Sequence, residues 1–338
     1  MRIAVTVDPE IPVPPKHYGG IERIVDMLVR GLAACGHEVI LFANPASDVA
    51  CKLLPYPGLR SRSLLDIGRN TWFTASRILG WRPDLVHSFG RLAYLFPILP
   101  LRIPKVMSYQ RVITEQRVRW AERLAGGTLH FTGCSDYLIR DFKHKKNWHV
   151  VYNAVPAAGY RCTPAVGGDA PLMFLGRIEE IKGPHLAIEV ARRSNRRLVI
   201  AGNISEGHER FFEQSIKPFL DGDRIRYVGP VDDRQKNQLL GEAAALLMPI
   251  LWDEPFGIVM TEALACGTPV IGLKRGSVPE VVQHGVSGFV CDSVEEMAAA
   301  VSMLSRIDRR TCRLMMEQRF SDRSLVGAFE NLYRQVAQ

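Results

Sequence analysis

The 338-residue sequence lacks the patterns that mark disordered, fibrous and membrane-spanning proteins. It has no low-complexity tract and no internal repeat, which argues for an ordinary folded protein. Its longest apolar runs, such as LAYLFPILPL at 92–101, are short and interrupted by proline, so none is expected to span a bilayer. The start, MRIAVTVDPE, reads as a buried strand and a turn without a signal-peptide pattern, and we expect a cytoplasmic protein.

Paired cysteines and a dinucleotide fingerprint are also missing. The seven cysteines include no Cys-x-x-Cys pair and no cluster with histidine at metal-ligand spacing. We therefore expect buried free thiols rather than disulfides or a zinc site. No G-x-G-x-x-G follows a predicted strand, which argues against a nicotinamide or flavin enzyme.

The charge is distributed unevenly along the chain. Residues 1–153 contain 21 lysines and arginines against 12 acids, a net charge of +9, whereas residues 154–338 contain 22 against 23, a net charge of −1. This asymmetry favours an anionic partner of the N-terminal half, either a charged acceptor or an acidic membrane surface, and a solvated basic face is the alternative. Basic runs such as KHKK at 143–146 lack a recognisable nucleic-acid-binding module, so no nucleic acid is expected.

Short apolar runs alternate with helical patterns from one end of the chain to the other. The expected strands lie at 2–7, 38–43, 84–89, 171–176, 197–202, 225–229, 245–250 and 268–273, and a further short strand is expected around GFVC at 288–291. This alternation is typical of parallel sheets covered by helices on both faces, and the length suits two such domains. A stretch rich in Gly, Pro and Ala at 153–171 predicts a linker. We therefore expect an α/β fold with two Rossmann-like lobes, at 1–153 and 154–318, whose parallel sheets face a central cleft.

Two features of the first lobe suggest ligand contacts. Gly19 and Gly20 precede an amphipathic helix that starts near Ile21, and paired glycines there permit close backbone approach to an anion. A plain turn explains the same pair. His87 is expected at the carboxyl end of the strand at 84–89, on the cleft side, where an imidazole hydrogen-bonds a sugar hydroxyl or the reacting centre. A single histidine at such a position is more often structural.

Two cations follow a strand of the second lobe. In FLGRIEEIKGPHLAIEVARR at 174–193, Arg177 comes directly after the expected strand and Lys182 opens the next helix. An arginine and a lysine at the carboxyl end of a strand suit a phosphate or pyrophosphate. Surface pairing with Glu179 and Glu180 is the alternative.

Two glutamates bracket the apolar segment DEPFGIVMTEALACGTPVIG at 253–272. The proline and glycine between them place Glu254 in a loop, and a helix that begins near Gly257 or Ile258 and runs to about Ala265 places Glu262 one turn inside it. The N–H groups of a helix N-terminus bind an anion, and carboxylates accept hydrogen bonds from sugar hydroxyls, which together fit a sugar nucleotide. The alternatives are dipole pairing for Glu262 and a solvated loop position for Glu254.

These features together resemble the retaining family-4 glycosyltransferases, which have the two-lobed GT-B fold. Arg177 with Lys182, Glu254 with Glu262, and the runs ALACGTPVIG, GSVPEVV and GVSGFV are similar to the second lobe of that family. YGGIERIVDMLVRGLAACGHEV and PDLVHSF resemble the first lobe, and the tail at 319–338 resembles the helix that crosses back to it. At one position the family's His-x-His is replaced by His87-Ser88-Phe89.

The resemblance implies roles for the matching residues. The cations neutralise the departing diphosphate, Glu254 binds the transferred sugar, Glu262 binds the ribose, and the histidine lies beside the reacting sugar. The residues expected to take part in catalysis are His87, Arg177, Lys182 and Glu254. The residues expected to bind the donor are Gly19, Gly20, Phe256, Gly257, Ile258, Val259 and Glu262.

The resemblance also implies an enzyme that moves a sugar from a nucleoside-diphosphate sugar, expected to be UDP-linked, to an acceptor on the first lobe. Transfer is expected to proceed with retention and to need neither a metal ion nor a separate cofactor, because cations and helix ends stabilise the departing phosphate. We expect an anionic acceptor and peripheral membrane contact through the basic lobe. A sugar-nucleotide epimerase and a non-catalytic sugar-nucleotide-binding protein of the same fold are the alternatives.

Overall fold

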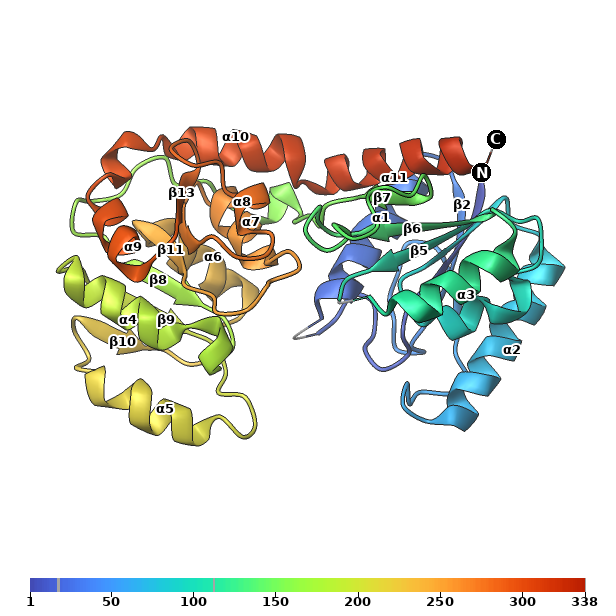
Figure 1. The fold of residues 1–338 in the computed structure, drawn as a ribbon, viewed down its shortest axis with the longest axis horizontal. Coiled ribbons are helices and arrows are strands. Elements are labelled where there is room, and N and C mark those ends of the chain that lie inside the picture. The colour runs from blue at the N-terminus through green and yellow to red at the C-terminus, as the bar shows by residue number, and fades with distance from the viewer. Residues whose placement is uncertain (17–18, 112, 338) are drawn as a thin grey trace. The chain divides into compact units, whose positions relative to one another are not determined.

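The chain divides into two compact units, each built around its own parallel sheet (Figure 1). The structure is a computed structural model that describes residues 1–16, 19–111 and 113–337. The first unit comprises Met1–Asn153 and Asp322–Gln338, and the second comprises Ala154–Ser321. Two parallel-sheet α/β domains confirm the expected fold class.

The sheet of the first unit has the strand order β3-β2-β1-β4-β5-β6-β7 in the described residues. Its strands are β1 (Arg2–Thr6), β2 (Glu38–Ala43), β3 (Lys52–Pro55), β4 (Leu85–Ser88), β5 (Lys105–Tyr109), β6 (Leu129–Gly133) and β7 (Trp148–Val150). The helices of this unit are α1 (Gly20–Ala34), α2 (Leu64–Trp81), the 3-10 helix η1 (Leu92–Ile98), α3 (Glu115–Ala125) and α11 (Asp322–Val336). The sequence did not predict β3, β5, β6 and β7, because the edge strands β3 and β7 are short and partly exposed and β5 and β6 carry polar residues.

The sheet of the second unit has the order β10-β9-β8-β11-β12-β13. Its strands are β8 (Leu172–Leu175), β9 (Leu198–Ala201), β10 (Ile225–Tyr227), β11 (Ala245–Met248), β12 (Val270–Leu273) and β13 (Gly288–Cys291). Its α-helices are α4 (Pro184–Arg193), α5 (Glu209–Ser215), α6 (Asp233–Glu242), α7 (Ile258–Ala265), α8 (Val278–Val281), α9 (Val294–Val301) and α10 (Arg309–Arg319). The short 3-10 helices are η2 (Ala157–Gly159), η3 (Glu180–Lys182), η4 (Lys217–Phe219) and η5 (Leu304–Arg306).

Each sheet has one point at which the strand order reverses. In the first unit β1 lies between β2 and β4, and in the second unit β8 lies between β9 and β11. In open parallel sheets, ligands bind at the carboxyl ends of the strands that flank such a switch point. The loops after β1 and β4, and those after β8 and β11, are therefore the places where side chains matter most for function.

Helix α11 and the stretch expected as a linker are both held by contacts with residues that are distant in the sequence. Helix α11 lies against α1 in the first unit, where a Cβ added at Gly31 would lie 2.2 Å from Cγ2 of Val326 (Figure 1). The stretch expected as a linker is held on the second unit from residue 154 onward. Its carbonyls accept hydrogen bonds from α10, from Arg309 Nε to Thr163 O at 2.7 Å and from Arg313 Nη1 to Tyr160 O at 2.8 Å.

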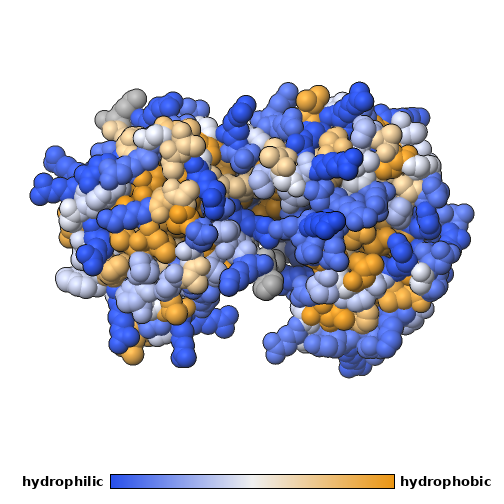
Figure 2. Space-filling model, turned by 180° about the vertical axis from the view of Figure 1, so that it is seen from behind, coloured by the Kyte–Doolittle hydropathy of each residue, from blue (hydrophilic) through white to orange (hydrophobic). Residues whose placement is uncertain are grey.

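The surface carries scattered apolar side chains. The face shown in Figure 2 is largely hydrophilic, with patches of apolar side chains between the charged ones. Among the described residues, no helix combines the length and the apolar character that crossing a bilayer requires.

Candidate functional site

Lys182 and Glu254 meet at the switch point of the second unit. Lys182 ends η3 in the connection after β8, and Glu254 lies in the loop after β11, where the sequence placed it. The distance from Lys182 Nζ to Glu254 Oε2 is 2.5 Å, and Trp252 Nε1 donates to the same oxygen at 3.1 Å. The Lys182 and Glu254 side chains are only 16% and 14% exposed, so the ion pair is largely buried and shielded from water.

The loop after β12 packs against the backbone of Glu254. Its segment GSVPEVV brings Gly276 so close that an added Cβ would lie 2.4 Å from the carbonyl oxygen of Glu254. Ser277 donates from its backbone N–H to that carbonyl at 3.0 Å and from its hydroxyl to Phe256 O at 2.8 Å. Only glycine fits the first of these positions, and its φ of 53° lies in the left-handed region that glycine favours.

Helix α7 begins at Ile258 and ends at Ala265, which confirms the expected bounds. Gly257 is its N-cap residue with φ 73°, a conformation that lets the chain turn sharply into the helix. The first N–H groups of a helix have no partner within it and therefore suit an anion. Phe256 differs from expectation, because its side chain is 2% exposed and packs on Phe320 with ring centroids 5.8 Å apart. Its ring anchors the loop and is not open to a donor.

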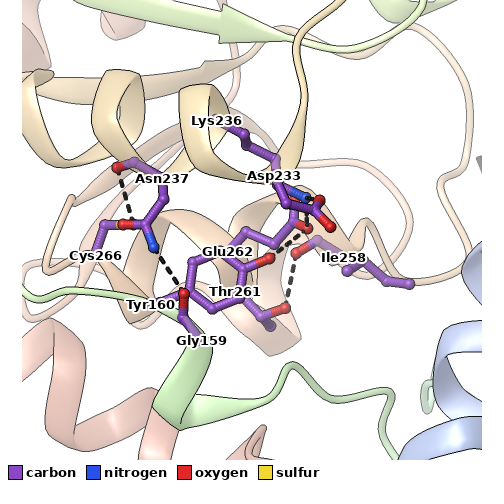
Figure 3. A network of polar contacts seen from close by, with 9 residues as sticks. All are labelled: Gly159, Tyr160, Asp233, Lys236, Asn237, Ile258, Thr261, Glu262 and Cys266. Atoms are coloured by element: carbon purple, nitrogen blue, oxygen red, sulfur yellow. Dashed lines mark hydrogen bonds and ion pairs between the residues drawn. The ribbon is translucent and has the colours of Figure 1, made fainter. Parts of the chain in front are cut away.

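Glu262 is the centre of a polar network that joins three parts of the second unit (Figure 3). Its Oε1 accepts from Lys236 Nζ of α6 at 2.5 Å and from Tyr160 Oη at 2.8 Å. Burial alone lowers the pKa of Lys236, but Glu262 and Asp233 outweigh it and raise that pKa above its ordinary value. Burial, with the carboxylate beside it, raises the pKa of Tyr160. Lys236 thus stays cationic and Tyr160 stays protonated, so both donate to the carboxylate.

Sequence reasoning missed Lys236 and Tyr160. Lys236 lies in a polar helix and Tyr160 in an irregular stretch, and neither position carries a motif. Asp232 caps the same helix by accepting from the backbone N–H of Gln235, and this cap fixes where α6 begins. Only the fold shows that these residues reach a common carboxylate.

Arg177 lies next to the Lys182–Glu254 pair in sequence but has another partner. Its Nη1 lies 2.5 Å from Glu179 Oε1, which also accepts from Ser205 Oγ at 2.7 Å. This is the pairing that the sequence offered as the alternative for the arginine. The Arg177 side chain remains 42% exposed, whereas Glu179 is nearly buried, so the guanidinium is oriented from one side and open on the other.

His87 differs from the expectation that it faces a ligand. It lies in β4 with 0% exposure, and its two ring nitrogens lie 2.6 Å from Tyr333 Oη of α11 and 2.7 Å from Ser108 Oγ of β5. Burial lowers the pKa of His87 to about 3, so the ring is neutral at physiological pH. The fold thus uses this histidine to join α11 to the sheet, because a side chain at this register points into the helix layer.

Gly19 and Gly20 lie where the sequence placed them, at the start of α1 after β1. An added Cβ at Gly19 would lie 2.6 Å from Cβ of Pro15, so this position accepts no side chain without movement. Gly20 is the first residue of the helix. The residues directly before them, 17 and 18, lie outside the described part of the chain.

A pocket of about 1150 Å³ lies on the first unit. Asp8 after β1, Arg91 after β4 and Arg111 after β5 reach it from the carboxyl edge of the sheet, and η1 and α3 form its wall. Burial raises the pKa of Asp8, and Arg91 and Arg111 oppose this shift. Each of these residues comes shortly after a strand, which is a position where ligand contacts are common. None belongs to a sequence motif, so the sequence analysis did not name them.

One pair of aspartates has a spacing that can hold a metal ion, Asp221-Gly222-Asp223. In the structure the pair forms an exposed turn before β10, where Asp221 Oδ1 accepts from the backbone N–H groups of Asp223, Arg224 and Ile225. Among the described residues, no group of three histidines, cysteines or acids is placed to hold a metal ion. The pair is a turn element at the amino end of a strand.

Comparison with known proteins agrees with this architecture. The family described as Glycosyl transferases group 1 matches residues 163–319, and Glycosyltransferase Family 4 matches residues 18–158. The glycogen synthase of Mycobacterium tuberculosis is 26% identical over an alignment that covers 87% of this chain and 84% of that protein. The D-inositol 3-phosphate glycosyltransferase of Mycobacterium marinum is 27% identical over 47% of this chain and 35% of its own length.

Among solved structures, Anabaena HepE in complex with UDP and glucose has a TM-score of 0.72 and 19% identity, and the match covers 99% of this chain and 100% of HepE. The two family matches adjoin and together span both units. The chain belongs to the glycosyltransferases that these two family models describe, and its fold is GT-B.

Proposed function

We propose that this chain transfers a sugar from a UDP-linked sugar nucleotide to an anionic acceptor, with retention at the anomeric carbon and without a metal ion. The observation that carries the proposal is the Lys182–Glu254 pair at the switch point of the second unit. A cation and a carboxylate held side by side at a ligand-binding edge suit a substrate that is both phosphate and polyol. UDP and glucose in HepE support the choice of donor.

The chemistry follows from the charge that develops on the leaving group. When the bond from the anomeric carbon to the diphosphate breaks, negative charge accumulates on the departing oxygen. Lys182 has two N–H donors left after its bond to Glu254, and Arg177 is open on one side, so both are available to that oxygen. Glu254 Oε1 makes no hydrogen bond to the described residues and accepts from a hydroxyl of the transferred sugar.

The same arrangement supports the proposal of retention without a metal ion. The acceptor hydroxyl attacks on the face from which the diphosphate leaves, and the departing phosphate oxygen takes its proton. Side-chain cations and the N-terminus of α7 supply the positive charge that a divalent ion supplies in other enzymes. The Asp221-Gly222-Asp223 turn takes no part in this scheme, because its carboxylate is occupied by backbone N–H groups.

The acceptor is proposed to bind on the first unit and to be anionic. Met1–Asn153 carries the whole positive excess of the chain, a net charge of +9. The name of one relative, D-inositol 3-phosphate glycosyltransferase, describes a phosphorylated acceptor for that protein. Both observations support an acceptor whose negative charge the basic unit attracts.

Peripheral membrane contact is proposed through α2. Leu65, Trp72 and Leu79 repeat every seven residues along this helix and are 74%, 75% and 54% exposed. Such a row beside basic side chains suits an acidic lipid surface. Sedimentation with acidic vesicles tests it, since Trp72→Ala should weaken salt-sensitive binding, and equal binding by variant and wild type would refute the contact.

The test of the main proposal combines binding with turnover. A thermal-shift screen of nucleoside diphosphates should show stabilisation by UDP and UDP-sugars, because a ligand that binds only the native state raises the melting temperature. Transfer is then followed by mass spectrometry with an acceptor pool, and product configuration by NMR. Donor conversion without acceptor would indicate an epimerase, and tight binding without turnover would indicate a binding protein; either result overturns the proposal.

A further inference from the structure

The pocket of the first unit has more positive charge than its own acids balance. Among the described residues, five arginines line it together with only two acids: Arg91, Arg111, Arg117, Arg119 and Arg123 with Asp8 and Glu115. Arg119 is occupied, because its Nε and Nη2 lie 3.0 and 2.6 Å from Glu115 Oε1. Arg111, Arg117 and Arg123 form no ion pair with any described residue. The positive charge of these three guanidinium groups is therefore available to an anion that does not belong to the chain.

Asp8 and Arg91 form a charged pair in the same pocket that is not closed by a hydrogen bond. Asp8 Oδ1 and Arg91 Nε lie 3.8 Å apart at the switch point of this sheet, which is too long for a hydrogen bond. Both atoms are buried and have no hydrogen-bond partner in the described part of the chain. Buried polar atoms without partners are rare in folded proteins. The two side chains are each 37% exposed, so their other polar atoms are open to a ligand hydroxyl, which would donate to the Asp8 carboxylate and accept from the Arg91 guanidinium.

An aromatic pair forms the apolar side of the pocket. The rings of Phe96 in η1 and Trp120 in α3 stack with centroids 5.2 Å apart and planes inclined by 9°. The two side chains are 48% and 50% exposed, so they give the pocket an open apolar wall. The pocket volume of about 1150 Å³ slightly exceeds the usual range for a small-molecule site, so there is room for a molecule larger than an inorganic ion.

We propose that this pocket binds the phosphate-bearing end of the acceptor, with Arg111, Arg117 and Arg123 on the phosphate and the Asp8 and Arg91 side chains on an acceptor hydroxyl. The aromatic pair would cover the apolar face of the acceptor body. A phosphate monoester fits better than a carboxylate, because it presents three oxygens and close to two charges to three guanidinium groups. The inference rests on the proposed function, since it gives the anionic acceptor a place and a chemical class.

The experiment compares two variants that lose the same charge from the first unit. The pocket variant replaces Arg111, Arg117 and Arg123 with glutamine, and the control variant replaces the exposed Arg60, Arg62 and Arg102, which do not line the pocket. Binding of glucose 6-phosphate is measured by calorimetry in the presence of saturating UDP, so that the donor site is occupied. Glucose is the uncharged control, and binding of UDP alone is measured for every variant.

The expected result is that wild type and control variant bind glucose 6-phosphate alike, while the pocket variant binds at least about tenfold more weakly. UDP affinity should be unchanged in all three proteins. A parallel arm with vesicles containing phosphatidic acid decides the source of the phosphate: retention of vesicles that depends on the three arginines assigns a lipid-linked acceptor, and binding of glucose 6-phosphate alone assigns a free sugar phosphate.

Two results would overturn the inference while leaving the proposed function intact. In the first, wild type binds UDP but neither glucose 6-phosphate nor phosphatidic acid vesicles. In the second, the pocket variant and the control variant bind both probes equally, which would mean that only net charge matters. Loss of UDP and UDP-sugar binding in wild type would instead refute the proposed function itself, so the two failures are distinguishable.

Discussion

The two sheets of this protein share one strand order around their switch points, yet the charges placed there differ in kind. In the second unit, Lys182 pairs with Glu254 and Lys236 pairs with Glu262, and all four side chains are less than one fifth exposed. In the first unit the switch point carries Asp8 and Arg91, which are 3.8 Å apart and each 37% exposed, and the exposed Arg111 after β5 has no ion-pair partner among the described residues. The same strand order therefore carries two different arrangements of charged side chains.

The difference has a physical consequence for binding. Charges that are paired and largely buried are fixed in direction and little affected by salt, which suits stabilisation of a charge that develops during reaction. Exposed and unpaired charges act over a longer range and are screened, which suits attraction of an anionic ligand from solution. The following predictions test this contrast, starting with the largest expected effect.

Lys182→Ala should reduce kcat for sugar transfer by about 10² to 10³, because it removes one preorganised donor to the leaving phosphate. It also leaves Glu254 with Trp252 as its remaining partner. Steady-state kinetics with UDP-sugar measures the loss. Lys217→Ala is the matched control, since Lys217 pairs with Glu213 on the surface. If both variants keep full activity and fold, the paired charges of the second unit are not catalytic.

Lys236→Met should lower the free energy of unfolding by about 1.5 to 3 kcal/mol, because the nearly buried Glu262 carboxylate loses a charged hydrogen-bond donor. We also expect a roughly tenfold higher KM for the donor with a smaller change in kcat, because the lysine orients Glu262 rather than the reacting atoms.

A double-mutant cycle with Glu262→Gln separates these effects. If Lys236 acts through Glu262, the lysine substitution should change donor KM much less when glutamine already stands at 262. Additive effects on donor KM would show that the lysine and the glutamate act independently, and would contradict the positioning role of Lys236.

The stability of the first unit should depend on His87 at mildly acidic pH. Burial holds the pKa of His87 at about 3, below its value in an unfolded chain, so the unfolded state takes up a proton first as the pH falls. The stabilising contribution is complete above about pH 6.5 and is lost progressively towards pH 3. Between pH 7 and pH 5 this group should cost about 2 kcal/mol of unfolding free energy.

Urea unfolding followed by tryptophan fluorescence at both pH values measures this dependence. His87→Asn should have a flatter pH profile than wild type, whereas the exposed His144→Gln should match wild type. An unchanged slope in His87→Asn would show that the histidine already titrates in the folded state near its ordinary value.

The smallest expected effect is a difference in salt dependence between ligand binding to the first unit and ligand binding to the second unit. Raising the salt concentration from about 0.05 to 0.5 M should increase the apparent Kd for glucose 6-phosphate severalfold, because exposed arginines are screened. The Kd for UDP should change less, since its proposed contacts are partly buried. Calorimetry at both salt concentrations gives the comparison, and equal salt dependence for both ligands would contradict the contrast between the units.

The sequence predicted those parts of the fold whose signal is local. Every expected strand has a counterpart in the structure, and α7 has the bounds that the glycines and the apolar run around it indicated. Strands β5 and β6 were missed because one buried serine, one buried threonine and one buried lysine break the apolar pattern, as Lys105 does at the start of β5. Its ammonium group is satisfied by two carbonyls and a hydroxyl, which no local pattern shows.

Local sequence patterns also singled out some of the site residues, but they did not show which side chains those residues contact. Residue spacing brought Lys182 and Glu254 to notice, but their ion pair depends on β8 and β11 being neighbours in the sheet, although 72 residues separate the pair. His87 shows the opposite outcome, because α11 from the far end of the chain covers it.

The sequence by itself determined the family, the two parallel-sheet domains and the segments that carry the donor motifs, because glycines, prolines and apolar periodicity act over a few residues. Only the tertiary structure decided that Lys236 and Tyr160 hold Glu262, that Phe256 and His87 are buried, and that the pocket is lined by three arginines that form no ion pair with a described residue. Those outcomes depend on which strands and helices become neighbours, and that is fixed by burial of the whole core rather than by any single stretch of chain.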